Sequence, residues 1–159
     1  ALNNVLQQKI NATDQLSFVF GIKTFKKGDK VMQTSNNYDK NVFNGDIGFV
    51  ANINREDRSF FVAFDSDRIV RYEFEESNEL VLAYAITIHK SQGSEFQAVV
   101  LPCVMSHYIM LQRNLIYTAI TRAKKLLVIV GTKKALKLAI SNFKTEPRYS
   151  GLLHRLTNI

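Results

Sequence analysis

The sequence predicts an α/β fold with a small all-β unit inserted behind an N-terminal helix. Three patterns carry this prediction. Apolar side chains recur at helical spacing in residues 2–10, short alternating runs divided by polar turns fill residues 23–79, and strand-like and helix-like segments alternate from residue 80 onward. We therefore expect a helix with its connector in residues 1–22, a β-barrel in residues 23–79 and an α/β lobe in residues 80–159.

The first two regions follow from local residue patterns. Residues 2–10 place four apolar side chains on one face of a short amphipathic helix, namely Leu2, Val5, Leu6 and Ile10. Strand-like runs follow at residues 30–35, 46–53, 59–64 and 69–74. Four or five strands in under sixty residues cannot form a sandwich, so an SH3-like barrel is the economical solution. Its expected core aromatics are Phe60, Phe61, Phe64, Tyr72 and Phe74.

The α/β lobe is predicted from elements that alternate along the chain. We expect strands at residues 81–84, 98–104 and 125–130, and helices at residues 87–92, at 110–123 and after Thr132, which can cap its helix. Gly93 is expected to close the first of these helices. The buried stripe of the helix at residues 110–123 is expected to be Leu111, Leu115, Ile116, Ala119 and Ile120. That of the helix after Thr132 is expected to be Leu136, Ala139, Ile140 and Phe143. Pro147 breaks the pattern, and residues 152–156 add a last helical turn.

Composition excludes several classes of protein. At 159 residues with 46% hydrophobic residues, the chain is expected to be globular. A single cysteine, Cys103, excludes a disulfide framework, and no apolar run approaches the roughly 20 residues of a membrane span. We therefore expect a cytoplasmic protein with no membrane partner and no metal site of its own. An N-terminus without Met favours a piece of a longer polypeptide.

The net charge of +7 indicates a polyanionic partner, and the charge is unevenly placed. From Arg122 to the end, nine Lys and Arg residues face one acid, Glu146. Lys133, Lys134 and Lys137 are nevertheless expected to be the solvated face of an amphipathic helix. Basicity alone therefore does not identify a nucleic-acid-binding protein.

The segment Thr87–Phe96, TIHKSQGSEF, carries the residues best suited to bind phosphates. A strand that ends in a turn bearing Thr87 and His89 presents hydroxyl, imidazole and backbone N–H groups at the carboxyl edge of the sheet, where α/β proteins bind ligands. Taken singly, Thr87 is more often a helix cap and His89 an ordinary surface histidine. The order of the whole segment is the stronger signal.

Three segments together resemble the RecD-like superfamily 1 DNA helicases, the family of the exodeoxyribonuclease V alpha subunit. They are Gly28–Gly48, Ala83–Phe96 and Arg113–Gly131. The resemblance implies a second RecA-like lobe, with the parallel sheet of P-loop NTPases, and an inserted SH3-like barrel. Because no strand precedes Leu2, we expect this sheet to be incomplete at its N-terminal edge.

The resemblance also implies roles for individual residues. It assigns Thr87 and His89 to single-stranded DNA and places Gln92, Gly93 and Glu95 near the nucleotide, with Glu95 at the ribose hydroxyl. Without the resemblance, Glu95 would be interpreted as a surface carboxylate.

Arg122 is the expected catalytic residue. In this superfamily the arginine of the final motif reaches across a cleft to the γ-phosphate, where its planar fork offsets the charge that develops during phosphoryl transfer. An arginine beside Lys124 and Lys125 at a helix end could otherwise be a solvated charge that interacts favourably with the helix dipole.

The resemblance implies ATP with Mg²⁺ as the cofactor, and most of its binding site is expected outside this chain. The sequence has no G-x-x-x-x-G-K-[ST] phosphate loop and no obvious acidic pair for Mg²⁺. The expected partners are single-stranded DNA, a first RecA-like lobe of the same polypeptide and nuclease subunits. The resemblance implies movement from 5′ to 3′, and the chain alone is expected not to hydrolyse ATP.

The barrel loop at residues 36–44 is a second candidate for contact with DNA. Tyr38 and Lys40 are its candidate residues, because stacking rings beside a cation hold single strands without sequence preference. Tyr38 as a simple anchor of the loop is an equal alternative. Two other functions also stay open: the helicase half of a conjugative relaxase, and a non-catalytic basic nucleic-acid-binding module. The module explains the charge but not the order of residues in the segment Thr87–Phe96.

Overall fold

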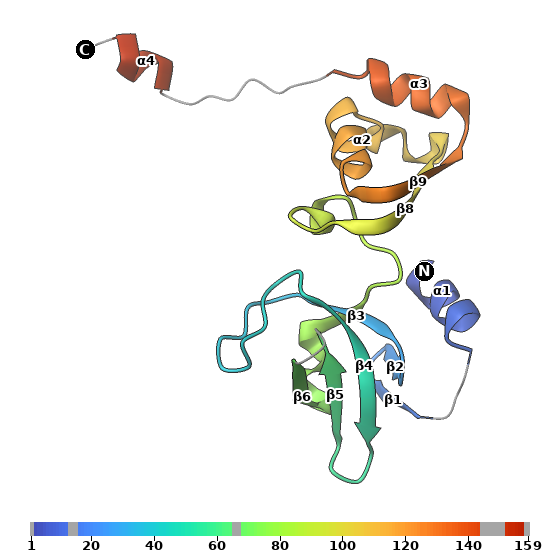
Figure 1. Ribbon diagram of the computed structural model, residues 1–159, viewed down its shortest axis with the longest axis vertical. Helices are drawn as coiled ribbons and strands as arrows, with labels where there is room; N and C mark the ends of the chain where they lie inside the picture. Colours follow the sequence, from blue (N-terminus) through green and yellow to red (C-terminus); the bar gives the residue numbers. More distant parts are fainter. Residues whose placement is uncertain (1, 13–15, 65–67, 144–151, 158–159) are drawn as a thin grey trace. The chain divides into compact units, whose positions relative to one another are not determined.

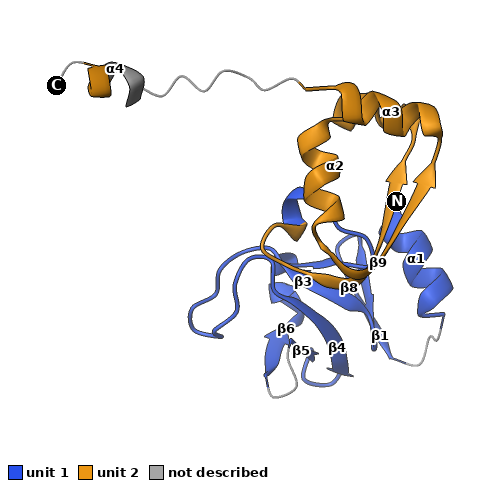
Figure 2. Ribbon diagram, turned by 45° about the horizontal axis from the view of Figure 1, so that its top comes forward, with its two compact units in different colours: residues 1–90 blue, residues 91–159 orange. Residues whose placement is uncertain are grey.

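The computed structural model describes residues 2–12, 16–64, 68–143 and 152–157. The chain divides into two compact units, Ala1–Lys90 and Ser91–Ile159 (Figures 1 and 2). The first unit is built on antiparallel strands, and the second combines helices with a parallel pair of strands. Among the described residues, no helix has the length and apolar character needed to cross a membrane.

The strands of the first unit form a hairpin and a five-stranded antiparallel sheet of order β6-β5-β4-β3-β7. Figure 1 labels β3 to β6 of this sheet. The hairpin joins β1 (Ser17–Phe20) to β2 (Lys23–Lys26). The sheet strands are β3 (Lys30–Gln33), β4 (Ile47–Asn54), β5 (Ser59–Ala63), β6 (Ile69–Glu73) and β7 (Leu80–Leu82), with the 3-10 turn η1 (Phe74–Glu79) before β7. The four expected runs are confirmed. The hairpin was not foreseen, because four-residue strands are too short for a periodic signal.

Aromatic rings fill the core of the first unit. Phe18 stacks on Phe74 with ring centroids 4.0 Å apart, and Phe60 lies 5.4 Å from Tyr72. Phe61 is only partly buried, because neighbouring residues on a strand point to opposite faces and Phe60 occupies the inner one. The expected core is confirmed for Phe60, Phe64, Tyr72 and Phe74.

The strand expected at residues 81–84 lies in the barrel sheet and not in the α/β lobe. β7 pairs antiparallel with β3, with Val81 opposite Met32, and Leu80 is fully buried in the aromatic core. A short apolar run suits either sheet, so the strand itself is confirmed, but the expectation that it belongs to the α/β lobe was wrong. The pairing partner decides the sheet, and periodicity carries no information about it.

The helix α1 (Leu2–Ile10) is confirmed, but it packs through its polar face. Leu2, Val5 and Ile10, which belong to the apolar face of the helix, are all exposed. The buried residue is Gln7, whose side-chain amide donates to the carboxylate of Asp29. The helix therefore packs against the barrel through its polar face, because polar partners there bond to it. The hydrophobic pattern alone would assign this face to solvent.

The second unit follows the expected order of strands and helices. β8 (Phe96–Cys103) and β9 (Ala123–Gly131) pair in parallel, as Figure 1 shows. The other elements are η3 (Met105–Met110), α2 (Arg113–Ile120), α3 (Lys133–Ser141) and α4 (Leu152–Thr157). The Thr132 hydroxyl caps α3 by accepting a hydrogen bond from the N–H of Ala135 at 3.1 Å. Pro147, and with it Glu146, lies outside the described residues.

The parallel pair is less buried than the sequence predicts. Val100 on β8 and Leu126 on β9 are both exposed, and so are Ile120, Ile140 and Phe143 of the expected helical stripes. An apolar run of this kind is typical of a parallel strand that is covered on both faces. Within the described residues, however, this sheet has two strands. The helical stripes are buried at Leu111, Leu115, Ile116, Ala119 and Ala139.

Candidate nucleotide and nucleic-acid interface

Two segments distant in sequence meet where the parallel strands begin. The backbone N–H of Phe96, which opens β8, donates to the carbonyl of Arg122, which precedes β9, at 2.8 Å. Residues 92–95 and Arg122 therefore lie at the amino ends of the two strands. The sequence predicted a site at the carboxyl edge, and this is corrected. Because β7 pairs within the barrel, the motif leads into the parallel strands instead of following one of them.

The Arg122 guanidinium is held by neutral acceptors. Its Nε donates to the Thr118 carbonyl at 3.3 Å, Nη1 to the Ser94 carbonyl at 3.2 Å and Nη2 to the Thr121 hydroxyl at 3.3 Å. In the part of the chain that the structure describes, Arg122 forms no ion pair with a carboxylate. A guanidinium has five N–H donors, so these bonds orient its plane and leave its charge available to an anion.

Glu95 is exposed. It forms an ion pair with Lys124, whose Nζ is 2.9 Å from Oε2 of the carboxylate. The hydrogen bond from Lys124 is the main cause that lowers the pKa of Glu95 below its ordinary value, and the charge of Arg122 contributes to the same shift. Glu95 is therefore ionised at neutral pH and can accept hydrogen bonds from sugar hydroxyls.

Replacing Lys124 by alanine is expected to raise the pKa of Glu95 toward its ordinary value. Because the folded pKa is lowered, the stabilisation from this pair is complete above the ordinary carboxyl pKa and is lost as the pH falls through the lowered value. An NMR pH titration of the Glu95 carboxyl carbon measures the change. Arg71→Ala, which removes a comparably exposed ion pair with Glu73 at 3.0 Å, is the control. An unchanged pKa of Glu95 in Lys124→Ala would contradict Lys124 as the main cause of the lowered pKa.

Gln92 and Gly93 connect the preceding turn to β8, and both are exposed. Gly93 has a φ of +83°, a conformation that glycine adopts without strain. Apart from Gly93 and its two chain neighbours, no described residue has a heavy atom within 4 Å of the position that a Cβ would take there. The turn therefore needs a glycine for its backbone conformation, and it leaves open space next to the main chain.

Thr87 and His89 belong to the first unit, because the division between the units falls after Lys90. The Thr87 hydroxyl accepts a hydrogen bond from the N–H of Lys90 at 3.3 Å and so caps the turn η2 (His89–Ser91). Thr87 and His89 are both exposed. The cap uses the hydroxyl as an acceptor, which leaves its O–H able to donate to a phosphate.

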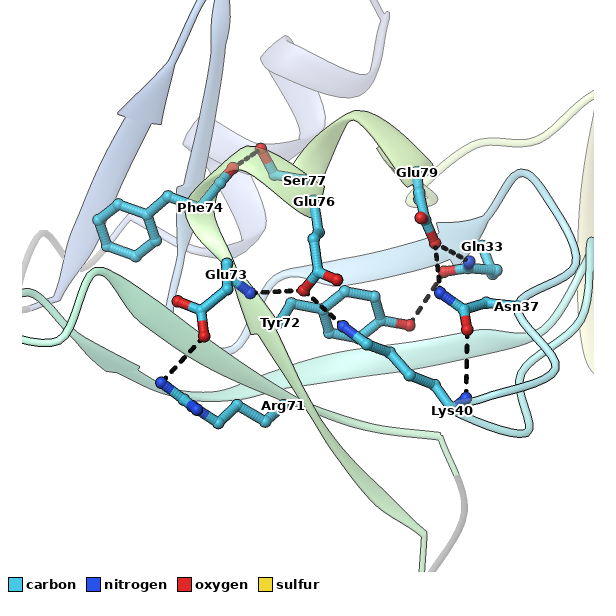
Figure 3. A network of polar contacts seen from close by, with 10 residues as sticks. All are labelled: Gln33, Asn37, Lys40, Arg71, Tyr72, Glu73, Phe74, Glu76, Ser77 and Glu79. Carbon is cyan, nitrogen blue, oxygen red and sulfur yellow. Dashed lines mark hydrogen bonds and ion pairs between the residues drawn. The ribbon is translucent and has the colours of Figure 1, made fainter.

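The two candidates in the barrel loop differ in their surroundings. The Lys40 ammonium pairs with the Glu76 carboxylate and lies 4.4 Å from the centroid of the Tyr72 ring (Figure 3). Its charge is therefore used within the barrel. Tyr38 is 76% exposed and meets Phe43 edge to face, with ring centroids 6.0 Å apart. The loop thus offers an aromatic surface, and its lysine serves the packing of the barrel.

The structure adds two groups that sequence reasoning missed. The Ser94 carbonyl orients Arg122, and a backbone acceptor has no signal in the sequence. Phe43 stands beside Tyr38 and is 39% exposed. An aromatic residue within the polar run NVFNGD was the signal that could have indicated it.

Two family models match the chain. Residues 2–64 match the ATP-dependent RecD-like DNA helicase SH3 domain, and residues 82–130 match the UvrD-like helicase C-terminal domain. Among relatives, the chain is 37% identical over 131 residues to the ATP-dependent RecD2 DNA helicase of Deinococcus radiodurans, a match that covers 82% of this chain and 18% of that protein. It is also 37% identical over 131 residues to the RecBCD enzyme subunit RecD of Haemophilus influenzae, and this match covers 79% of this chain and 18% of that protein. The chain thus spans about a fifth of the length of these relatives.

Solved structures of helicases share the fold. A Pif1 helicase from Bacteroides in complex with ADP-AlF3 and ssDNA has a TM-score of 0.63 at 19% identity, over 99% of this chain and 42% of that chain. A structure of Pif1 helicases at forked duplex DNA has a TM-score of 0.58 at 22% identity, over 97% and 42%. These matches confirm the expected RecA-like lobe with its SH3-like barrel. Carrying a RecD-like SH3 domain and a helicase C-terminal domain, and related to RecD and RecD2 helicases, the chain belongs to the RecD-like superfamily 1 helicases.

Proposed function

We propose that this chain is the C-terminal part of an ATP-dependent DNA helicase that translocates on single-stranded DNA from 5′ to 3′. The observation that carries the proposal is the set of hydrogen-bond partners around the Arg122 guanidinium. Three neutral acceptors orient its guanidinium, and its charge acts on Glu95 without forming an ion pair. An oriented but uncompensated guanidinium is suited to a phosphate that arrives from outside the chain.

On the nucleotide side, Arg122 is the arginine finger. It donates to the γ-phosphate and stabilises the charge that develops there during transfer, while Glu95 accepts from the ribose hydroxyl and Gln92 and Gly93 line the pocket. A first RecA-like lobe of the same polypeptide supplies the phosphate loop and holds most of the ATP and Mg²⁺. Among the described residues, no three His, Cys, Asp or Glu side chains gather as a metal site, so we assign no Mg²⁺ ligand to them. The chain alone should not turn over ATP.

On the DNA side, Thr87 and His89 hold the phosphate backbone of a single strand, and Tyr38 with Phe43 supports it by stacking. The segment Thr87–Glu95 is continuous, so a change at the nucleotide reaches the DNA contact through a few residues. ATP closes the cleft and strengthens the grip, and hydrolysis releases it. The protein acts in the cytoplasm, and nuclease subunits are proposed partners, since one relative is a RecBCD subunit.

Partial duplexes with a single-stranded tail test the proposed activity in the full-length protein. With ATP, we expect strand separation of the duplex with a 5′ tail and none of the duplex with a 3′ tail. Reactions without ATP and a blunt duplex are the controls. Unwinding from the 3′ tail alone would overturn the direction. Tight DNA binding without ATP hydrolysis would favour the non-catalytic module instead.

A further inference from the structure

The segment Leu82–Ala85, which leads from β7 toward Thr87, is bonded at successive positions to the rest of the first unit. The Asn3 side chain on α1 donates to the carbonyls of Leu82 at 2.9 Å and Ala85 at 3.0 Å, and accepts from the N–H of Ala85 at 2.7 Å. The N–H of Ala83 donates to the Lys30 carbonyl at 2.8 Å. A single side chain of α1 therefore clamps both ends of the segment.

Tyr84 ties the same segment to a buried carboxylate. Its hydroxyl donates to Oδ1 of Asp29 at 2.8 Å, and Asp29 is 0% exposed. Asp29 also accepts from the Gln7 and Asn11 side chains and from the N–H of Lys26. Burial, together with the bond to Asp29, raises the pKa of Tyr84 to about 12, so the hydroxyl remains a donor at neutral pH. The carboxylate thus joins α1, the β2–β3 turn and the segment before Thr87.

The orientation of α1 indicates what this network is for. A helix in a small domain normally buries its apolar stripe, whereas α1 exposes Leu2 and Val5 and uses Asn3 and Gln7 for its contacts. Asn3 contacts residues 82–85 directly, and Gln7 is linked to them through Asp29, which accepts from Tyr84. The clamp ends at Ala85, two positions before the exposed Thr87, whose hydroxyl is engaged in its own turn.

We propose that Asn3, Asp29 and Tyr84 are positioning residues for the DNA contact of Thr87 and His89. The barrel and α1 form a platform that sets the position and direction of the chain before it enters that turn. Groups at the end of a fixed segment lose less conformational freedom on binding, so the clamp raises the affinity for single strands. It does not touch the nucleotide. This inference rests on the proposed function.

Asn3→Ala and Tyr84→Phe in the full-length protein test the inference. Each is expected to raise the concentration of oligo(dT) that half-maximally stimulates ATP hydrolysis by about threefold to tenfold, the loss of one or a few hydrogen bonds. The rate at saturating oligo(dT) and the rate without DNA should stay nearly unchanged. Fluorescence anisotropy with labelled oligo(dT) should show the same shift in affinity. Asp29 itself is left intact, because its loss is expected to destabilise the unit.

Tyr72→Phe is the matched control. The Tyr72 hydroxyl donates to Oε1 of Gln33 at 3.0 Å inside the barrel (Figure 3). This bond involves none of the residues 82–85. Its loss should lower the midpoint of thermal unfolding but leave the half-stimulating concentration unchanged. If Tyr72→Phe and Tyr84→Phe raise the half-stimulating concentration of oligo(dT) equally, the effect is one of general stability, and the proposal is overturned.

Thr87→Ala distinguishes the proposed DNA contact of Thr87 and His89 from the positioning role of the clamp. If Thr87→Ala weakens DNA stimulation and the clamp variants do not, the DNA contact stands and the positioning role is rejected. If Thr87→Ala together with His89→Ala has no effect on DNA stimulation, the proposed DNA contact fails, and the positioning role fails with it.

Discussion

Replacing Arg122 by alanine in the full-length protein is expected to lower DNA-stimulated ATP hydrolysis by about three to five orders of magnitude. The guanidinium is oriented by Ser94, Thr118 and Thr121 and lacks a carboxylate partner among the described residues, so its removal deletes the charge that meets the γ-phosphate. The affinity for single-stranded DNA should change little, because Thr87 and His89 remain. Steady-state ATP hydrolysis and fluorescence anisotropy measure the two effects separately.

Two variants accompany this measurement. Arg122→Lys keeps the charge but loses the planar fork, so it should recover only a small part of the rate. Arg71→Ala removes an exposed arginine of the barrel that pairs with Glu73, and it should hydrolyse ATP at the normal rate. A rate for Arg122→Ala within roughly tenfold of the unmodified protein would reject the finger role.

Replacing Asp29 by alanine is expected to lower the free energy of unfolding of the first unit by about 3 to 5 kcal/mol. The carboxylate is fully buried and accepts from Gln7, Asn11, Lys26 and Tyr84. The two amide side chains have second acceptors in the Thr24 and Lys27 carbonyls. The Lys26 N–H and the Tyr84 hydroxyl both lose their bond to this carboxylate, and the loss of a bond to a charged, buried acceptor is costly.

Hydrogen exchange of the barrel amides in increasing urea measures this loss for the first unit alone. The amide of Val50, which is buried and bonded to the Asp29 carbonyl at 2.9 Å, is a suitable reporter. Asp57→Ala is the control, since Asp57 lies on the exposed β4–β5 turn, and its removal should cost no more than about 0.5 kcal/mol. Equal destabilisation by the two substitutions would contradict a special role for Asp29.

Local sequence determined the elements whose signal is contained within a few residues. The alternation in β4 and β5 reflects the two faces of a strand, and the apolar spacing in α2 reflects the helical period. Thr132 caps α3 through a hydrogen bond to a residue three positions away, and Gly93 adopts a positive φ, which is a property of that residue alone. The helicase motifs were likewise recognisable as strings, which is why the family followed from the sequence.

Tertiary structure alone decided which partners these elements meet. β7 joins the barrel through β3, α1 packs through Asn3 and Gln7, and the charge of Lys40 is taken up by Glu76. It also placed the candidate nucleotide residues at the amino ends of β8 and β9. The physical reason is sequence separation. Asn3 and Ala85 stand 82 positions apart, and a contact between them gains free energy only once the chain between them is folded, so no local pattern encodes it.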